Sequence, residues 1–223
     1  MISESKPCCP KKGETETGPK MKVIVTGFGP FRDITENPSE MILKELKDSY
    51  ADGAIKVEKQ ALEVNANSCD SFINKHKEEI CKKENIPVVF LHMGVDANSW
   101  LVKLEKQYVN RRIFDLCTTE LCCADSICKK SEYNSCVHSG INVDKLAKLA
   151  EEAELKVKTS ENAGDYLCNY LGYMSTTNLQ CKDVYTLFVH VTEFYSIPKE
   201  EQVKIIEWII TNLPKCLDGK SCE

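Results

Sequence analysis

A cysteine and a histidine in two successive segments of this chain could together carry out covalent hydrolysis. Cys168 lies in Ser160–Tyr170 and His190 lies in the apolar run Leu187–Val191. A thiol is a good nucleophile only as the thiolate, and an imidazole at hydrogen-bond distance can generate that thiolate near neutral pH. Upstream, Glu105 is a carboxylate that could orient such an imidazole. The three residues are therefore candidates for nucleophile, base and orienting group.

Each candidate also has an ordinary structural interpretation. Spacing alone favours a buried structural role for Cys168, because free cysteine is among the most buried residue types. His190 could be a core histidine with a polar partner, and His92 ends a similar apolar run and is a rival base. Glu105 stands in a Lys-Glu-Lys run, and this charge pattern favours a solvated surface carboxylate. The other two histidines are predicted at the surface: His76 and His138.

Strands and helices are expected to alternate along the chain. Apolar runs predict buried strands at 22–26, 87–93 and 185–191, and helical spacing predicts helices at 37–50, 68–83, 143–155, 163–177 and 198–213. This alternation predicts an α/β fold, a single-domain three-layer α/β/α sandwich with a mostly parallel twisted sheet. Active sites in such folds lie at the carboxyl ends of strands. Four candidate segments are expected at those ends: Thr26–Phe28, Gly94, Ser160–Gly164 and His190.

The loop after the first predicted strand carries two phenylalanines. Its sequence, Thr-Gly-Phe-Gly-Pro-Phe at 26–31, resembles a phosphate-binding turn only loosely, since it lacks a third glycine and a following Gly-Lys-Ser/Thr. Phe28 and Phe31 on a loop shaped by glycine and proline suit a flat apolar ligand better than a phosphate. A tight turn with ordinary core aromatics and a nucleotide-binding module are the alternatives.

Composition narrows the class of protein. The net charge of −5 provides no basic field to attract nucleic acid, and no apolar run is long enough to cross a bilayer. Residues 1–20 are polar and lack the apolar core of a secretory signal, so we expect a disordered N-terminal extension. One folded domain is expected over 21–215, with a flexible tail at 216–223. The 13 cysteines are an odd number, which favours a reduced, cytoplasmic protein over a disulfide framework.

Five of these cysteines cluster in one stretch of the chain. They are Cys117, Cys122, Cys123, Cys128 and Cys136. The cluster lacks the paired Cys-x2-Cys spacing of strong zinc signatures, so free thiols on a surface loop, or one local disulfide, are the preferred interpretations. A metal- or redox-regulated interaction protein remains a rival function that rests on this cluster.

Taken together, these segments resemble the pyroglutamyl-peptidase I family, with a Cys-rich stretch more similar to its animal-type members. The matching segments occur in the family's order over about 21–213: Val25–Phe31, Glu36–Ser39, His92–Gly94, Leu104–Lys106 with Asn110, Asn162–Asn169 and Phe188–Val191. The resemblance implies a cysteine peptidase that removes an N-terminal pyroglutamyl residue without a metal or other cofactor. It implies that Cys168 is the nucleophile, His190 the base and Glu105 the orienting carboxylate.

The resemblance also implies a substrate pocket and a class of partner. Phe28 and Phe31 would flank the lactam ring, and Asn37 would support the pocket. Small peptides with N-terminal pyroglutamate would be the partners of a monomer or weak homo-oligomer, with no nucleic acid and no membrane. Three residues depart from those usual in the family, and none belongs to the implied triad: Asn162, Tyr108 and Thr192. A catalytically silent pyroglutamyl-binding protein of the same fold is the alternative.

Overall fold

A sheet of seven strands forms the middle layer of the molecule, in the order β2-β3-β1-β4-β9-β5-β8. The computed structural model describes residues 18–31, 35–83, 86–113 and 124–217. The strands of this sheet are β1 (Met21–Phe28), β2 (Ser49–Tyr50), β3 (Ile55–Leu62), β4 (Val88–Val95), β5 (Val102–Glu105), β8 (Val157–Ser160) and β9 (Val184–Val191). A separate pair consists of β6 (Gln107–Val109) and β7 (Cys136–His138).

The central block of the sheet is parallel and its ends are not. β3, β1, β4 and β9 pair in parallel, whereas β5 pairs antiparallel with β9, and β8 follows the direction of β5. The prediction of a mostly parallel sheet in an α/β fold is confirmed. One detail was wrong: β8 runs opposite to β9, so Ser160–Gly164 do not follow the carboxyl edge that β1, β4 and β9 share.

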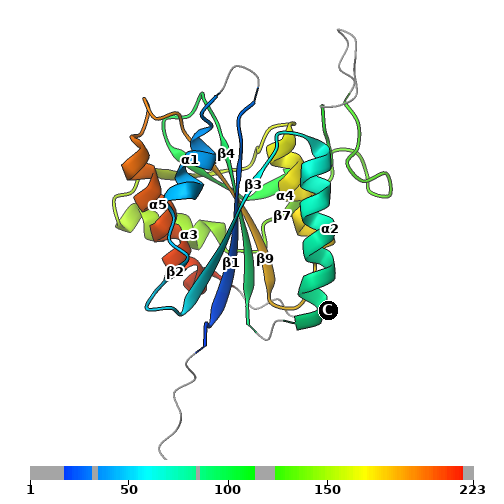
Figure 1. Ribbon diagram of the computed structural model, residues 1–223. Helices are drawn as coiled ribbons and strands as arrows, with labels where there is room; N and C mark the ends of the chain where they lie inside the picture. The colour runs from blue at the N-terminus through cyan, green and yellow to red at the C-terminus, as the bar shows by residue number, and fades with distance from the viewer. Residues whose placement is uncertain (1–17, 32–34, 84–85, 114–123, 218–223) are drawn as a thin grey trace, which may run out of the picture.

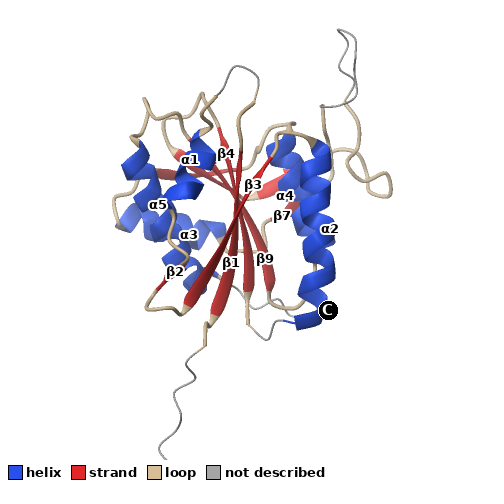
Figure 2. Ribbon diagram, in the orientation of Figure 1, coloured by secondary structure: helices blue, strands red, loops and turns tan. Residues whose placement is uncertain are grey.

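Helices cover both faces of the sheet (Figures 1 and 2). On one face lie α1 (Pro38–Glu45), α3 (Val143–Glu152) and α5 (Lys199–Asn212), followed by the short 3-10 helix η1 (Leu213–Cys216). On the other lie α2 (Ala66–Lys83) and α4 (Leu167–Asn178). Each face has its own apolar core, because the alternate side chains of the strands point to opposite faces. The candidate residue Cys168 lies on the face covered by α2 and α4.

The central strands form because their residues are apolar and largely β-branched or aromatic. Every residue of β9 is buried, and β4 is buried up to Gly94, as expected for strands covered on both faces. α1 begins where Asn37 Oδ1 accepts from the Ser39 N–H at 3.1 Å, with Pro38 in the first turn.

The expected helix over 37–50 is shorter in the structure. α1 ends at Glu45, and Tyr50 lies in β2, which forms a hairpin with β3. The turn between these strands has positive φ at Ala51, Asp52 and Gly53. A hairpin turn with this backbone conformation reverses the chain, and the sequence pattern did not predict it.

Tyr108 has a structural role at the centre of the fold. Its side chain is fully buried, and its hydroxyl accepts from the Phe188 N–H at 2.8 Å. A Cβ atom at Gly172 would lie 2.3 Å from the Tyr108 ring, so α4 can approach this ring only with glycine at that position. Tyr108 thus joins β6, β9 and α4 below the carboxyl edge of the sheet.

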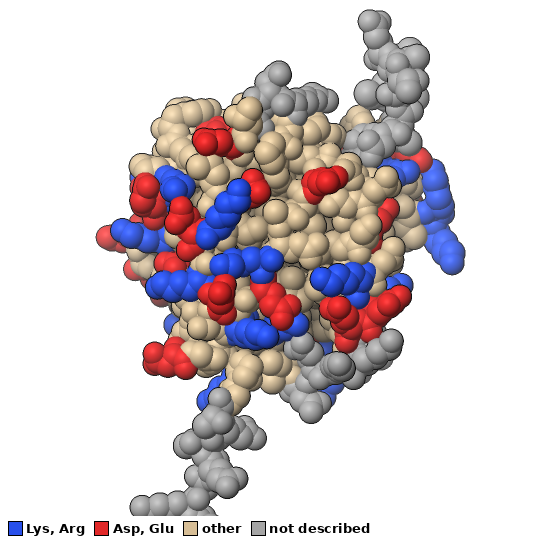
Figure 3. Space-filling model, in the orientation of Figure 1, with Lys and Arg blue, Asp and Glu red and all other residues tan. Residues whose placement is uncertain are grey.

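Charges of both signs are interspersed on the face shown in Figure 3, mainly over its middle and lower part. This surface has no large single-sign field, in line with the modest net charge of −5. Among the residues that the structure describes, no helix combines the length and the apolar character needed to cross a membrane.

Candidate active site

Cys168 is the second residue of α4, so it lies in the first turn of that helix. The helix start rests on β4 at Gly94, where a Cβ atom would lie only 2.8 Å from Cys168 Sγ. Glycine at this strand position therefore makes room for the sulfur. The N-cap residue, Tyr166, makes no side-chain capping hydrogen bond. First-turn N–H groups and the positive end of the helix dipole favour negative charge at this place.

His190 lies on β9 between a carboxylate and the thiol. Its Nδ1–H donates to Glu105 Oε1 at 2.7 Å, and the ring also bonds to the Cys168 side chain. Burial lowers the pKa of His190, but electrostatic interaction and hydrogen bonding with Cys168 and Glu105 outweigh that effect and raise the pKa to about 10. The imidazole is thus held in its protonated form.

Glu105 is completely buried at the end of β5, with no exposed side-chain surface. The interpretation of this residue as a solvated charge in a Lys-Glu-Lys run is wrong. It fails because β5 is inserted between β9 and β8, which puts the middle residue of the run inside the protein. Its second oxygen, Oε2, has no hydrogen-bond partner among the described residues. A buried carboxylate of this kind is tolerated beside a cation, and His190 is the cation.

A cavity of about 190 Å³ opens beside the thiol. Its lining consists mainly of apolar and aromatic side chains: Phe28, Phe31, Asn37, Val64, Val95, Tyr166, Leu167 and Cys168. The rings of Phe31 and Tyr166 lie 5.9 Å apart. Phe28, Phe31 and Asn37, for which the resemblance implies one pocket, line the same cavity, together with Cys168. Its size and apolar walls suit a small flat group.

Comparison with known proteins assigns the chain to a family. The sequence model described as pyroglutamyl peptidase matches residues 21–207, which is most of the chain. The chain belongs to the pyroglutamyl peptidase family. It is 29% identical over 180 residues to a pyrrolidone-carboxylate peptidase of Pyrococcus furiosus, a match covering 77% of this chain and 80% of the relative. Human pyroglutamyl-peptidase 1 is 28% identical over 175 residues, covering 78% and 79%.

Solved structures show the same fold. A mutant pyrrolidone carboxyl peptidase from Pyrococcus furiosus matches with a TM-score of 0.73 at 22% identity, covering 87% of this chain and 98% of that one. Pyroglutamyl peptidase I from Bacillus amyloliquefaciens matches with a TM-score of 0.74 at 16% identity, covering 89% and 98%. At these identities the likeness concerns the arrangement of the chain.

This member of the pyroglutamyl peptidase family fixes the start of α4 with polar contacts that sequence reasoning missed. The buried Asn169, next to the thiol, donates through Nδ2 to the carbonyls of Val109 and Arg111 at 2.8 and 2.9 Å, and its Oδ1 accepts from the Val109 N–H at 2.8 Å. Arg111 also pairs with Asp165 through Nε at 2.7 Å. These bonds hold the helix start against β6. The only signal in the sequence was that Asp165 and Asn169 flank the cysteine.

The other histidines lie away from the thiol. His92 is fully buried, its Nδ1 lies 2.8 Å from Thr26 Oγ1 and its Nε2 2.8 Å from Ser175 Oγ. Burial, followed by the neighbouring His76, lowers the pKa of His92 to about 3. His138 is exposed, as expected, but His76 is buried against Phe72 and Phe90, so its predicted surface position was wrong. It lies on the inward face of α2.

Of the cysteine cluster, Cys117, Cys122 and Cys123 lie outside the described residues. Cys128 and Cys136 are described, and both are free thiols. Within the described ranges, no group of three His, Cys, Asp or Glu side chains is arranged to hold a metal ion. For the whole cluster, a surface loop with free thiols or one local disulfide stays the prediction.

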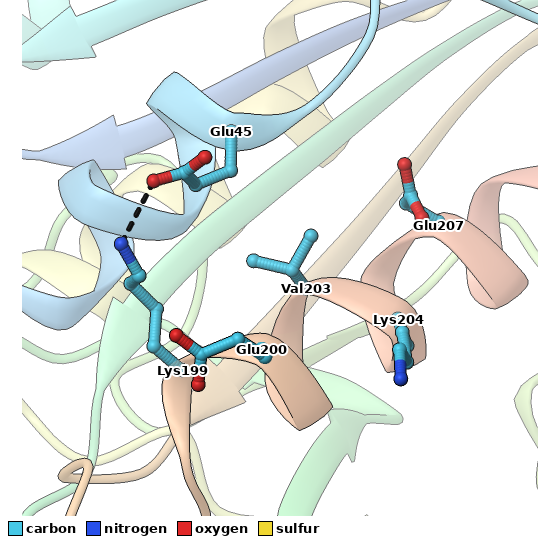
Figure 4. Close-up of a pocket in the computed structure, with 6 residues that line it drawn as sticks. All are labelled: Glu45, Lys199, Glu200, Val203, Lys204 and Glu207. Atoms are coloured by element: carbon cyan, nitrogen blue, oxygen red, sulfur yellow. Dashed lines mark hydrogen bonds and ion pairs between the residues drawn. The ribbon is translucent and has the colours of Figure 1, made fainter.

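A second hollow, of about 300 Å³, lies between α1 and α5 (Figure 4). It is lined by Glu45, Lys199, Glu200, Val203, Lys204 and Glu207, and Lys199 Nζ donates to Glu45 at 2.8 Å. Lys199 and Glu45 pair with each other, and the lining includes no cysteine, serine or threonine that could act as a nucleophile. It also lies on the opposite face of the sheet from α4, so the site beside Cys168 is the better candidate.

Proposed function

We propose that this protein is a cysteine peptidase that hydrolyses the bond after an N-terminal pyroglutamyl residue, with Cys168, His190 and Glu105 as its catalytic residues. The observation that carries the proposal is the chain of contacts from the Glu105 carboxylate to the His190 ring and on to the Cys168 thiol, beside an apolar cavity. Membership of the pyroglutamyl peptidase family supports the substrate class.

The pyroglutamyl ring is small, flat and neutral, which suits the cavity. Phe28, Phe31 and Tyr166 would contact its methylenes, and polar groups at the rim would bond its lactam N–H and C=O. Asn37 would act mainly through the backbone, since its side chain caps α1 and donates to the Gly29 carbonyl at 3.1 Å. A prolyl residue lacks the ring carbonyl, so a site that bonds this group should reject it.

Catalysis would proceed in two steps. The Cys168 thiolate attacks the scissile carbonyl carbon, and amides in the first turn of α4 stabilise the oxyanion. Protonated His190 then gives its proton to the leaving amine as the carbon–nitrogen bond breaks, which leaves a thioester. In the second step neutral His190 takes a proton from water, whose oxygen attacks the thioester; the carbon–sulfur bond breaks, pyroglutamate leaves, and the Cys168 thiolate and protonated His190 are restored. Glu105 orients the ring through Nδ1 throughout.

No cofactor enters this scheme, and small peptides with N-terminal pyroglutamate are its substrates. We infer a peptidase domain over 21–215 and a monomer or weak homo-oligomer. We also infer a cytoplasmic location, because Cys128, Cys136 and Cys168 are free thiols that a reducing compartment preserves.

A fluorogenic pyroglutamyl-coumarin amide under reducing conditions tests the proposal. The parent protein should release coumarin, and Cys168→Ser should lower kcat/KM by about 10³-fold or more, because the hydroxyl is a far weaker nucleophile here. Cys128→Ser is the matched control, since it removes another partly exposed free thiol and should leave the rate unchanged. Prolyl-coumarin amide should not be cleaved. Binding of a pyroglutamyl peptide without turnover by the parent protein would instead indicate the silent binding protein.

A further inference from the structure

Two aromatic side chains are strongly exposed near the carboxyl edge of the sheet. Trp100 is 70% exposed and Tyr195 is 73% exposed. Their rings form an edge-to-face pair with centroids 6.3 Å apart and an interplanar angle of 74°. Such a pair presents a large apolar surface to water, in a protein that buries most of its described aromatic side chains.

The two loops that carry this pair are tied together. Tyr195 donates its hydroxyl proton to the Ala97 carbonyl at 3.0 Å, and the Asp96 N–H donates to the Val191 carbonyl at 2.9 Å. Lys103 pairs with the Asp96 carboxylate and so fixes the far end of the first loop. The pair therefore has a defined place in the structure and little freedom to lose when a ligand binds.

The order of the strands places this pair on the leaving-group side of the site. Across the sheet the strands follow one another in the order β1, β4, β9, β5. Phe28 of β1 lines the cavity, Gly94 of β4 lies against the thiol, and His190 is on β9. The loop with Trp100 leaves β4 and enters β5, so it passes the end of β9, and Tyr195 follows β9 directly.

The loop is also continuous with the site itself. Val95 lines the cavity, and the next residue, Asp96, lies within electrostatic range of the His190 ring. Burial raises the pKa of Asp96, whereas Lys103, the Asn98 N–H and His190 lower it, and the lowering prevails. A peptide whose first ring fills the cavity and whose scissile nitrogen faces His190 would continue over this loop.

We propose that Trp100 and Tyr195 bind the side chain of the first or second residue after pyroglutamate, and that they favour aromatic or bulky apolar side chains there. The proposal rests on the proposed function, because it needs a substrate held at Cys168. A second copy of the chain is less suited to cover this aromatic pair than a substrate side chain. Stable interfaces bury about 1,200–2,000 Å² in all, and these two rings are the only large exposed apolar side chains of the described residues placed on these loops.

The test compares three peptide amides by release of pyroglutamate: pyroglutamyl-Gly-Gly, pyroglutamyl-Phe-Gly and pyroglutamyl-Gly-Phe. The parent protein should prefer one of the phenylalanine peptides by about 3- to 10-fold in kcat/KM, the range expected for one aromatic contact. The double variant Trp100→Ala, Tyr195→Ala should reduce the ratio of kcat/KM values to about one. Its kcat/KM for pyroglutamyl-Gly-Gly should change by less than about 2-fold. Tyr195→Phe should keep the preference, because it retains the aromatic ring that makes the contact.

Tyr133→Ala is the matched control, since it removes a 44% exposed aromatic ring from a different loop. Equal rates for the three peptides with the parent protein would overturn this inference and leave the proposed function standing. Cleavage of none of them would overturn the proposed function. If the double variant cleaved all three peptides more slowly by the same factor, the pair would have a structural role. If it changed the mass measured by sedimentation, the pair would form a contact between copies. Either result would also overturn the inference.

Discussion

His92 and His190 lie on neighbouring parallel strands, and each comes near the end of a buried apolar run, yet the structure gives them opposite properties. In the register of the two strands His190 is paired with Gly94, two residues beyond His92. His92 lies between two hydroxyls and has a pKa lowered to about 3, whereas His190 lies between a carboxylate and a thiol and has a pKa raised to about 10. The strand on which a histidine lies therefore says little about its chemistry.

The difference arises from the elements that pack against each ring. β4 has parallel neighbours, and its inward histidine meets Thr26 of β1 and Ser175 of α4. β9 has β5 on its other side, and this antiparallel strand brings Glu105 to Nδ1 of His190. Charged partners stabilise the imidazolium, whereas two neutral hydroxyls without solvent do not.

The largest effect should come from removing His190. His190→Ala should lower kcat/KM for the pyroglutamyl-coumarin amide by about 10³-fold, because general acid–base catalysis is lost together with the partner of the thiolate. His138→Ala is the control, as it removes an exposed histidine and should have no effect. His190→Asn is a second variant that keeps a polar group beside Glu105, in case His190→Ala does not fold. Circular dichroism would show whether each variant is folded. An active, folded His190→Asn protein would contradict the assignment of the base.

Glu105→Gln should have the next largest effect, a loss of about 10²-fold in kcat/KM. The amide can still accept from Nδ1, but it carries no charge to stabilise the imidazolium. Without that charge the pKa of His190 should fall, so the alkaline limb of the rate profile, near pH 10 in the parent protein, should move to lower pH. Alkylation by iodoacetamide measured against pH would report the same shift without turnover. An unchanged alkaline limb would remove Glu105 from the site.

Much of this molecule was predictable from the sequence, because its central strands are continuous apolar runs. The runs at 22–26, 87–93 and 185–191 correspond to β1, β4 and β9, and the alternation of strands and helices gave the layers correctly. Cys168 is in the first turns of a helix, as the helical pattern after Ser160 predicts. These features depend on local composition, which the sequence displays directly.

The features that the sequence did not predict correctly depend on contacts between distant segments. The direction of β5 and β8, and with it the burial of Glu105, follows from how short strands pair at one end of the sheet. Lys103–Lys106 show nothing locally that separates a buried carboxylate from a solvated one. The bonds of Asn169 to β6 join residues about 60 positions apart. Residue patterns alone left His92 and His190 as equal candidates, and only their partners in space separate them.

Removal of His92 should have the smallest effect on catalysis and a clear effect on stability. His92→Ala should change kcat/KM by less than about 3-fold at temperatures where the variant is folded, because the ring does not reach the thiol. It leaves two buried hydroxyls, Thr26 and Ser175, without their partner, and should lower the free energy of unfolding by about 2–4 kcal/mol. Thermal unfolding would measure this loss, and a loss of activity as large as that of His190→Ala would reverse the two roles.

The same residue predicts a dependence of stability on pH. In the unfolded chain a histidine takes up a proton near pH 6.5, whereas His92 in the folded protein does so only at about 3. Between these values the unfolded state binds the extra proton, so this contribution to stability is complete above pH 6.5 and declines as the pH falls towards 3. His92→Gln retains an amide between the two hydroxyls but cannot titrate. Urea unfolding of both proteins at several pH values should therefore give a shallower decline for His92→Gln, and equal slopes would mean that His92 is not held neutral.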